Sequence, residues 1–164
     1  MPKLPFDAVV EAHGATVLRV CRAVLGPVDA DDAWSETFLA ALKAYPALPA
    51  DANVQAWLVT IAHRKAVDVV RATARRATPT SELPDTAPAP AADDPDPDLA
   101  DCVARLAPKQ RQVVAYHYLA GLPYADVATL VGGSAAAARR AGADGIAALR
   151  TSYPGLNATT GAPR

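Results

Sequence analysis

One block in the middle of the chain most constrains what it can fold into. The stretch TPTSELPDTAPAPAADDPDPDLA (78–100) repeats proline and acidic residues and holds almost no large apolar side chain. Such a segment cannot bury enough surface to offset the entropy that ordering would cost. Residues 78–97 are therefore predicted to be a flexible linker, because compact domains rarely contain a structureless loop of this length. The chain is then divided into two small folded units, 1–77 and 98–152, with a flexible tail at 153–164.

Composition predicts that both units are helical. Apolar residues make up 51% of the 164 residues, and alanine supplies much of that share. Alanine favours helices, and the alternating β-branched runs that mark strands are missing. The predicted fold class is all-α, with two small helical domains joined by the linker.

Charge is distributed unevenly around a net value of −1. Residues 77–98 carry six acidic and no basic residues, and the segments on either side are neutral to basic. Affinity for phosphate follows local charge rather than the total. Nucleic-acid binding by either half is therefore compatible with this composition.

Three or four helices are expected before the linker, and three of them are placed at residues 5–25, 31–44 and 53–76. Gly26-Pro27 ends the first, and Asp29 or Asp31 is expected to cap the second. The apolar side of the second helix is predicted to hold Trp34, Phe38, Leu39 and Leu42. The third ends in the basic run RATARR.

After the linker, helices are expected at 98–106 and from Pro108 to about Leu119. The next stretch, AGLPYADVATLVGGSAAAARRAGADGIAALR, predicts a helix, a glycine turn and a second helix. That is the plan of a helix-turn-helix. Its inward-facing residues are predicted to be Tyr124, Val127, Ala128, Val131, Ala138, Ile146 and Leu149.

Several function classes have no support in the sequence. His13, His63 and His117 share no metal-ligand spacing with Cys21 or Cys102, and no phosphate-binding glycine loop or nucleophile elbow occurs. No apolar stretch is long enough for a membrane span, and no secretory leader opens the chain. We expect a cytoplasmic protein that is not an enzyme, with no catalytic or metal-binding residues, no cofactor and no membrane insertion.

Three stretches in order resemble a known family. DADDAWSETFLAAL (29–42) and VQAWLVTIAHRKAVDVVRATARR (54–76) resemble the helices of sigma region 2, and LADCVARLAPKQRQVVAYHYLAGLPYADVATLVG (99–132) resembles sigma region 4. Together they resemble a group IV sigma factor of the extracytoplasmic-function (ECF) type. The resemblance implies that the chain binds core RNA polymerase and promoter DNA, and that an anti-sigma factor holds it inactive.

The resemblance also implies contacts for region 2. The positions that match the polymerase-binding helix are Asp31, Asp32, Ser35, Glu36 and Phe38. Carboxylates there would pair with a basic coiled coil, although they would also favour a helix N-terminus. The positions that match binding of the −10 element are Asn53, Trp57, His63, Arg64, Lys65, Arg71, Arg75 and Arg76. Trp57 continues an apolar stripe, so the core is its alternative place, and a solvated helix face is the alternative for the cations.

In region 4, the positions that match −35 binding are Lys109, Arg111, Ser134, Arg139 and Arg140. The family motif at the start of the recognition helix is replaced by alanines, and Asp144 stands where a later Arg is usual. Gly142 and Gly145 lie inside this helix, each at a cost of about 1 kcal/mol relative to Ala. We expect a weakly folded helix that reads few bases.

Several interpretations of this helix stay open. The chain is a working sigma factor that relies on region 2, a sigma-like protein whose region 4 mainly binds another protein, or a paralogue that has drifted toward alanine and lost activity. A stand-alone helix-turn-helix regulator is a further hypothesis, but it leaves the acidic-aromatic helix at 29–42 unexplained.

Overall fold

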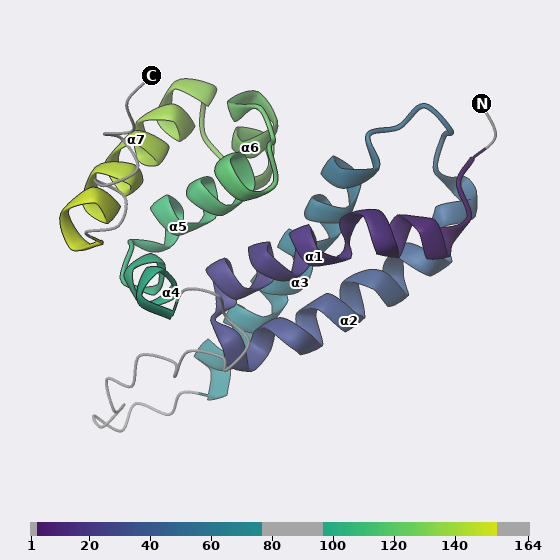
Figure 1. The fold of residues 1–164 in the computed structure, drawn as a ribbon, viewed down its shortest axis with the longest axis horizontal. Helices are drawn as coiled ribbons and strands as arrows, with labels where there is room; N and C mark the ends of the chain where they lie inside the picture. The colour runs from purple at the N-terminus through teal and green to yellow at the C-terminus, as the bar shows by residue number, and fades with distance from the viewer. Residues whose placement is uncertain (1–2, 77–96, 154–164) are drawn as a thin grey trace, which may run out of the picture.

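The computed structural model describes residues 3–76 and 97–153, and every regular element in these ranges is helical (Figure 1). The prediction of an all-α chain is confirmed. The predicted linker lies outside the described residues apart from Pro97, which begins a helix, and the predicted tail lies outside them apart from Tyr153. Among the described helices, none combines the length and the apolar character that a membrane crossing requires.

Three helices form the first half. They are α1 (Phe6–Leu25), α2 (Pro27–Ala44) and α3 (Val54–Arg76), with a short 3-10 turn, η1 (Tyr45–Ala47), after α2. Buried Val9, Val17, Phe38 and Leu58 bring the three helices together around small neighbours such as Ala30, Ala33 and Ala41. Alanines let the helix axes approach closely, so few large side chains are enough to fill this core.

The start of α2 differs from the prediction. Gly26 has φ 83°, and Pro27 occupies the first turn of α2, four residues before the predicted start. A proline fits there because its missing N–H would have no partner within the helix. The predicted cap at Asp29 or Asp31 is wrong, since both residues lie within the helix. Asp29 lies in its first turn, where a carboxylate still stabilises the N-terminus.

The second half begins with α4 (Pro97–Ala104) and α5 (Pro108–Val114), and α5 continues into a π-helical turn, η2 (Ala115–Leu119). α6 (Tyr124–Val131) and α7 (Ala135–Ser152) follow, joined by a turn in which Gly132 and Gly133 have φ 89° and 87°. The helix-turn-helix arrangement of α6 and α7 agrees with the sequence pattern. Val127, Ala128, Ala138 and Leu149 are buried, as expected.

The two glycines inside α7 have a packing role that the sequence analysis misses. An added Cβ at Gly145 would lie 2.8 Å from Val114 Cγ2, and one at Gly142 would lie 3.2 Å from Val113 Cγ1. Both glycines are buried, so α7 packs directly against α5 at these positions. The expected weakness of α7 is therefore offset by a close helix-helix contact that a larger residue would prevent.

The two halves share one buried cluster in addition to the clusters of their own, whereas the sequence predicts only a separate core in each. One cluster joins Val20, Val24, Val59 and Ala66 of the first half to residues of the second half, among them fully buried Val113 and Tyr116. α1 contacts α4, α5 and η2, and the two groups of helices lie side by side in Figure 1. Residues separated by the linker are therefore packed against each other.

Candidate nucleic-acid and protein interfaces

Four of the five predicted polymerase-binding residues are exposed on α2. Asp31, Asp32, Ser35 and Glu36 are all accessible on its outer side. Phe38 differs, because its side chain is only 6% exposed and its ring lies 4.6 Å from the ring of Trp34 between centroids. In this structure Phe38 is a core residue, while the acidic side chains are free to meet a partner.

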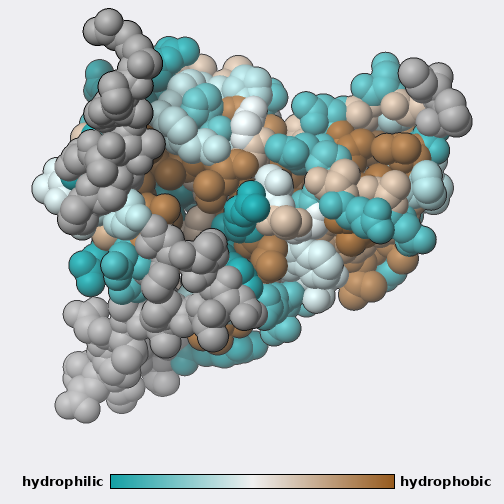
Figure 2. Space-filling model, in the orientation of Figure 1, coloured by the Kyte–Doolittle hydropathy of each residue, from teal (hydrophilic) through white to brown (hydrophobic). Residues whose placement is uncertain are grey.

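The same side of α2 carries exposed apolar residues. Val28, Leu39 and Leu42 are 78%, 59% and 52% exposed. The prediction that Leu39 and Leu42 belong to the apolar core side is wrong, because of the four predicted residues only Trp34 and Phe38 turn inward. We define the acidic-apolar face of α2 as Val28, Asp31, Asp32, Ser35, Glu36, Leu39 and Leu42. In the view of Figure 2, apolar residues (brown) are visible over the helices of the first half and over those of the second half.

Helical periodicity explains why this face is continuous. Val28, Asp32, Ser35 and Leu39 follow one another at spacings of three or four residues, so they lie along one side of the helix. The sequence signal that would have separated Leu39 from Phe38 is the angle of about 100° between successive helical residues. A face that combines carboxylates with large exposed apolar side chains is typical of a surface that binds another protein.

The start of α3 is fixed by Asn53. Its Oδ1 accepts a hydrogen bond from the Ala56 N–H at 3.1 Å, which caps the helix, and its side chain remains exposed. Trp57 is half-buried, with its ring 6.2 Å from that of Tyr45 between centroids. The indole therefore packs against the first-half core and keeps a partly accessible edge.

Beyond Trp57, α3 presents a row of cations. Arg64, Arg71, Arg75 and Arg76 are exposed, and Lys65 is half-buried. Arg64, Arg71 and Arg75 share one side of the helix, because their spacings are seven and four residues. Exposed Asp68 lies on the same side and lowers its positive charge by one. We call these five basic residues the cationic row of α3.

His63 is directed toward the second half. Its Nδ1 lies 2.7 Å from the hydroxyl of Tyr116, and the two rings meet edge to face. Burial lowers the pKa of His63, with a further lowering by the charge of Arg64, and a hydrogen bond to the Leu130 backbone opposes both. In the arrangement described here, His63 is half-buried and joins the two halves, whereas most of the cationic row is exposed.

Arg111 also lies between the halves. Its guanidinium donates to the carbonyl of Val24 at 3.3 Å and to the carbonyls of Ala104 and Leu106 at 2.8 and 3.0 Å. Burial lowers its pKa. These bonds occupy the side chain that the resemblance assigns to −35 binding, so in this structure Arg111 connects α1, α4 and α5. A third contact across the halves is the bond from the Gln55 amide to the Ala120 carbonyl.

The first turns of α7 hold the remaining predicted residues. Ser134 Oγ accepts the N–H of Ala137 at 3.1 Å and caps the helix. Arg139 and Arg140 are exposed. The guanidinium of Arg139 lies over the ring of Tyr124, 5.4 Å from its centroid. Ser134 is thus a structural cap, and the two arginines are the accessible cations of this helix.

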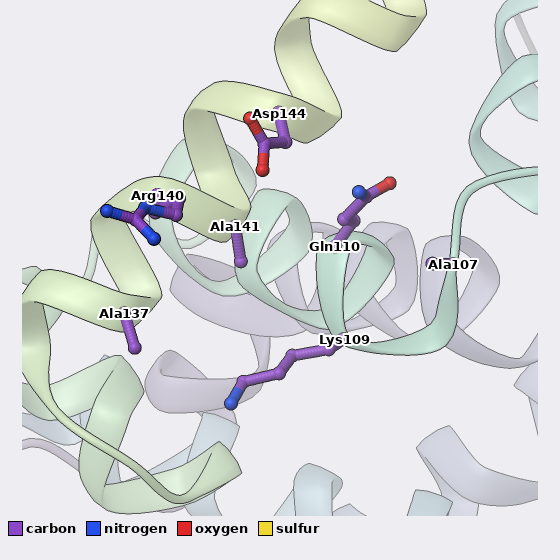
Figure 3. A pocket seen from close by; sticks show the side chains of 7 residues that line it. All are labelled: Ala107, Lys109, Gln110, Ala137, Arg140, Ala141 and Asp144. Atoms are coloured by element: carbon purple, nitrogen blue, oxygen red, sulfur yellow. The ribbon is translucent and has the colours of Figure 1, made fainter.

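A shallow groove of about 320 Å³ lies between the start of α5 and α7 (Figure 3). Lys109 and Arg140 border it together with Gln110 and Asp144. Lys109 reaches the glycine turn, where its Nζ would be 3.4 Å from a Cβ on Gly133. Two cations from different helices and the carboxylate of Asp144 therefore border one groove, and the two cations are the groups there that could contact a DNA phosphate.

The described residues offer no comparable site for metal chemistry. Within 3–76 and 97–153, no three His, Cys, Asp or Glu side chains gather as the ligands of a metal ion would. The features that remain are the acidic-apolar face of α2, the cationic row of α3, and the cations around α7.

Comparisons with protein families agree with this layout. Residues 9–76 match the model of sigma-70 region 2, and residues 98–149 match that of sigma-70 region 4. The chain is 32% identical over 111 residues to the ECF RNA polymerase sigma factor SigK of Mycolicibacterium vanbaalenii. That match covers 62% of this chain and 57% of the relative, so it spans little more than half of the relative's length.

Two solved structures share the fold. The sigma factor RpoE in complex with the anti-sigma factor NepR, from Bartonella quintana, superposes with a TM-score of 0.75 at 17% identity, covering 89% of this chain and 94% of that one. CnrH in complex with the cytosolic domain of CnrY superposes with a TM-score of 0.61 at 22% identity, covering 89% and 85%. At these identities the likeness shows the fold alone.

Proposed function

Because this chain belongs to the sigma-70 family, as a factor of the ECF type, we propose that it directs core RNA polymerase to promoters and starts transcription there. It acts in the cytoplasm by binding and performs no catalysis of its own. The observation that carries the proposal is the order of surfaces: an acidic-apolar face on α2, then a cationic row on α3, and two cations bordering a groove between α5 and α7.

Core polymerase binds the acidic-apolar face of α2. Asp31, Asp32 and Glu36 give it a charge that complements a basic partner, and such complementarity speeds and orients association. Exposed Leu39 and Leu42 supply apolar area that becomes buried on binding. Phe38 contributes indirectly, because it packs beneath this face and keeps α2 in place.

Promoter DNA binds two separate surfaces. The −10 element meets Asn53, the exposed edge of Trp57 and the cationic row of α3, in which the guanidinium and ammonium groups contact phosphates. The −35 element meets Lys109 of α5 together with Arg139 and Arg140 of α7. Ser134 caps α7, and Arg111 joins α5 to α1 and α4, so both residues support this second surface structurally. His63 becomes available to DNA only when the halves separate.

An anti-sigma factor is the third partner in the proposal. The fold of this chain is shared with RpoE and CnrH, whose structures are complexes with NepR and with the cytosolic domain of CnrY. A bound inhibitor of that kind would cover surfaces that polymerase needs. Its removal would then be the step that starts transcription.

Capture of purified core RNA polymerase by the full chain tests the proposal. The triple variant Asp31→Ala, Asp32→Ala, Glu36→Ala is expected to lose at least tenfold in affinity, because it removes the charges that face the partner. The matched control Glu11→Ala, Asp51→Ala, Asp126→Ala removes three exposed acids elsewhere and is expected to bind like the wild type. Equal losses in both variants, or no capture by the wild type, would contradict the proposal. If the captured polymerase then makes no transcript from genomic DNA, the result would favour a sigma-like protein that only binds other proteins.

A further inference from the structure

Tyr124 stands at the centre of an aromatic cluster beside α7. Its ring stacks on that of His117, with 3.8 Å between centroids and 17° between planes. Its hydroxyl lies 3.5 Å from the hydroxyl of Tyr118. On the α7 side, the guanidinium of Arg139 lies over the Tyr124 ring. One aromatic side chain at the start of α6 therefore contacts η2 and the exposed side of α7 together.

Gly142 makes room for this ring. A Cβ added to Gly142 would lie 3.1 Å from the Tyr124 hydroxyl oxygen and 3.2 Å from Cε1. Gly142 follows Arg139 by three residues, so the two share one side of α7. The absence of a side chain at Gly142 lets the Tyr124 ring approach α7 one turn away from Arg139. Gly142 has a low helix propensity, but its missing side chain leaves the space that the Tyr124 ring occupies.

Arg139 is held by this cluster and keeps its hydrogen-bonding groups unused. It is exposed, and it makes no hydrogen bond or ion pair with any residue that the structure describes. A guanidinium that lies over an aromatic ring without bonding to it keeps its N–H groups free for another partner. Stacking on an aromatic ring also limits the directions that a long side chain samples. We therefore expect this arginine to sample fewer directions before it meets a ligand than an arginine without a ring beneath it.

Arg140 offers a contrast on the same helix. It is exposed and borders the groove with Lys109 and Asp144, and it has no aromatic ring beneath it in the described part of the chain. Asp144 follows Arg140 by four residues, so a carboxylate accompanies this second cation on its side of the helix. Two neighbouring arginines are thus presented differently, one over a tyrosine ring and one beside a carboxylate.

We propose that Tyr124 is a positioning residue that orders Arg139 for contact with the phosphate backbone of the −35 DNA. This inference rests on the proposed function, since it needs region 4 to meet duplex DNA. Alanines leave α7 few polar side chains with which to hold DNA, so the ordering of one arginine matters more. Ordering a long side chain in advance removes a cost that binding would otherwise include, which corresponds to about 3- to 10-fold in affinity.

A double-mutant cycle on the full chain, assembled with core RNA polymerase, tests this inference. Equilibrium binding is measured to a duplex promoter fragment recovered by transcription with the same holoenzyme. Tyr124→Leu is expected to weaken binding about 3- to 10-fold in the wild-type background. The same change is expected to cost less than about twofold when Arg139→Ala is already present, because there is no guanidinium left to order. Tyr124→Phe, which keeps the ring, is expected to restore most of the affinity.

Two further measurements, the salt dependence of binding and the effect of Tyr124→Leu in an Arg140→Ala background, distinguish a positioning role of Tyr124 from damage to the fold. Arg139→Ala is expected to lower the slope of log affinity against log salt by about one, whereas Tyr124→Leu keeps the slope and lowers only the affinity. In an Arg140→Ala background, Tyr124→Leu is expected to retain its full effect. Equal losses from Tyr124→Leu in the wild-type and Arg139→Ala backgrounds would overturn the inference alone. Failure of wild-type holoenzyme to bind any promoter would overturn the proposed function and the inference together.

Discussion

At the scale of single residues, two glycines inside helices have different structural roles. Gly145 looks in the sequence like a weak point in the recognition helix, yet it lies against Val114, where a methyl group would come within 2.8 Å. Gly14 in α1 is also helical, but a Cβ there would meet Trp34 at an ordinary contact distance of 3.5 Å. Substitution by alanine is therefore expected to change the free energy of unfolding in opposite directions at these two glycines.

We expect Gly145→Ala to lower the free energy of unfolding by about 1–2 kcal/mol, because overpacking outweighs the gain in helix propensity. Gly14→Ala is the matched control and is expected to raise it by up to about 1 kcal/mol. Urea denaturation of both variants measures the difference. A stabilised Gly145→Ala protein would show that α5 and α7 are not in close contact.

His63 provides a prediction on pH. Its pKa is lowered in the folded chain, chiefly by burial, so the unfolded chain takes up a proton first as the pH falls below about 6.5. Stability that is fully present above this value is then lost toward lower pH, at no more than about 1.4 kcal/mol per pH unit. Denaturation curves between pH 7.5 and 5 should show wild type losing stability relative to His63→Gln. Parallel profiles for the two proteins would contradict the lowered pKa of His63.

At the scale of helices, caps decide where elements begin. Ser134 caps α7 through the Ala137 N–H, and we expect Ser134→Ala to cost about 1 kcal/mol of stability. Ser35 is exposed within α2 and makes no side-chain hydrogen bond to the described residues, so Ser35→Ala is the neutral comparison. Thermal unfolding measures both. Equal shifts of the two melting temperatures would argue against the cap.

Sequence patterns predict these helices well, because periodicity, prolines and glycines are local signals. The ends of α1 and α3 agree with the pattern to within a residue, while α4 ends two residues early and α2 starts four residues early, where Gly26 and Pro27 outweigh the Asp caps. The site is harder to predict. The helical angle of about 100° per residue separates Phe38 from Leu39, but the three carbonyls that Arg111 bonds to are set by how distant helices pack.

At the scale of the whole molecule, the shared core is the main departure from sequence reasoning. Val59 of α3 is fully buried in a cluster with residues of α5, η2, α6 and α7, and His63 and Gln55 add hydrogen bonds across the halves. In this arrangement α3 lies against the second half. We therefore expect the halves to stabilise each other in the free chain and to separate when both bind promoter DNA.

Val59→Ala tests this mutual stabilisation. We expect a loss of about 2 kcal/mol from the cavity, together with faster hydrogen exchange in α6 and α7 as well as in α3. Val9→Ala is the matched control, because Val9 belongs to the cluster of the first half alone, and its effect on exchange is expected to stay there. Unchanged exchange in α6 and α7 of the Val59→Ala protein would show that the halves are energetically independent.

The most direct test of the central claim is run-off transcription from genomic fragments by core RNA polymerase, with and without the chain. The account predicts discrete transcripts that appear only with the chain and disappear with the Asp31→Ala, Asp32→Ala, Glu36→Ala variant. The same transcripts with and without the chain, or none in either case, would contradict a role as a promoter-directing subunit.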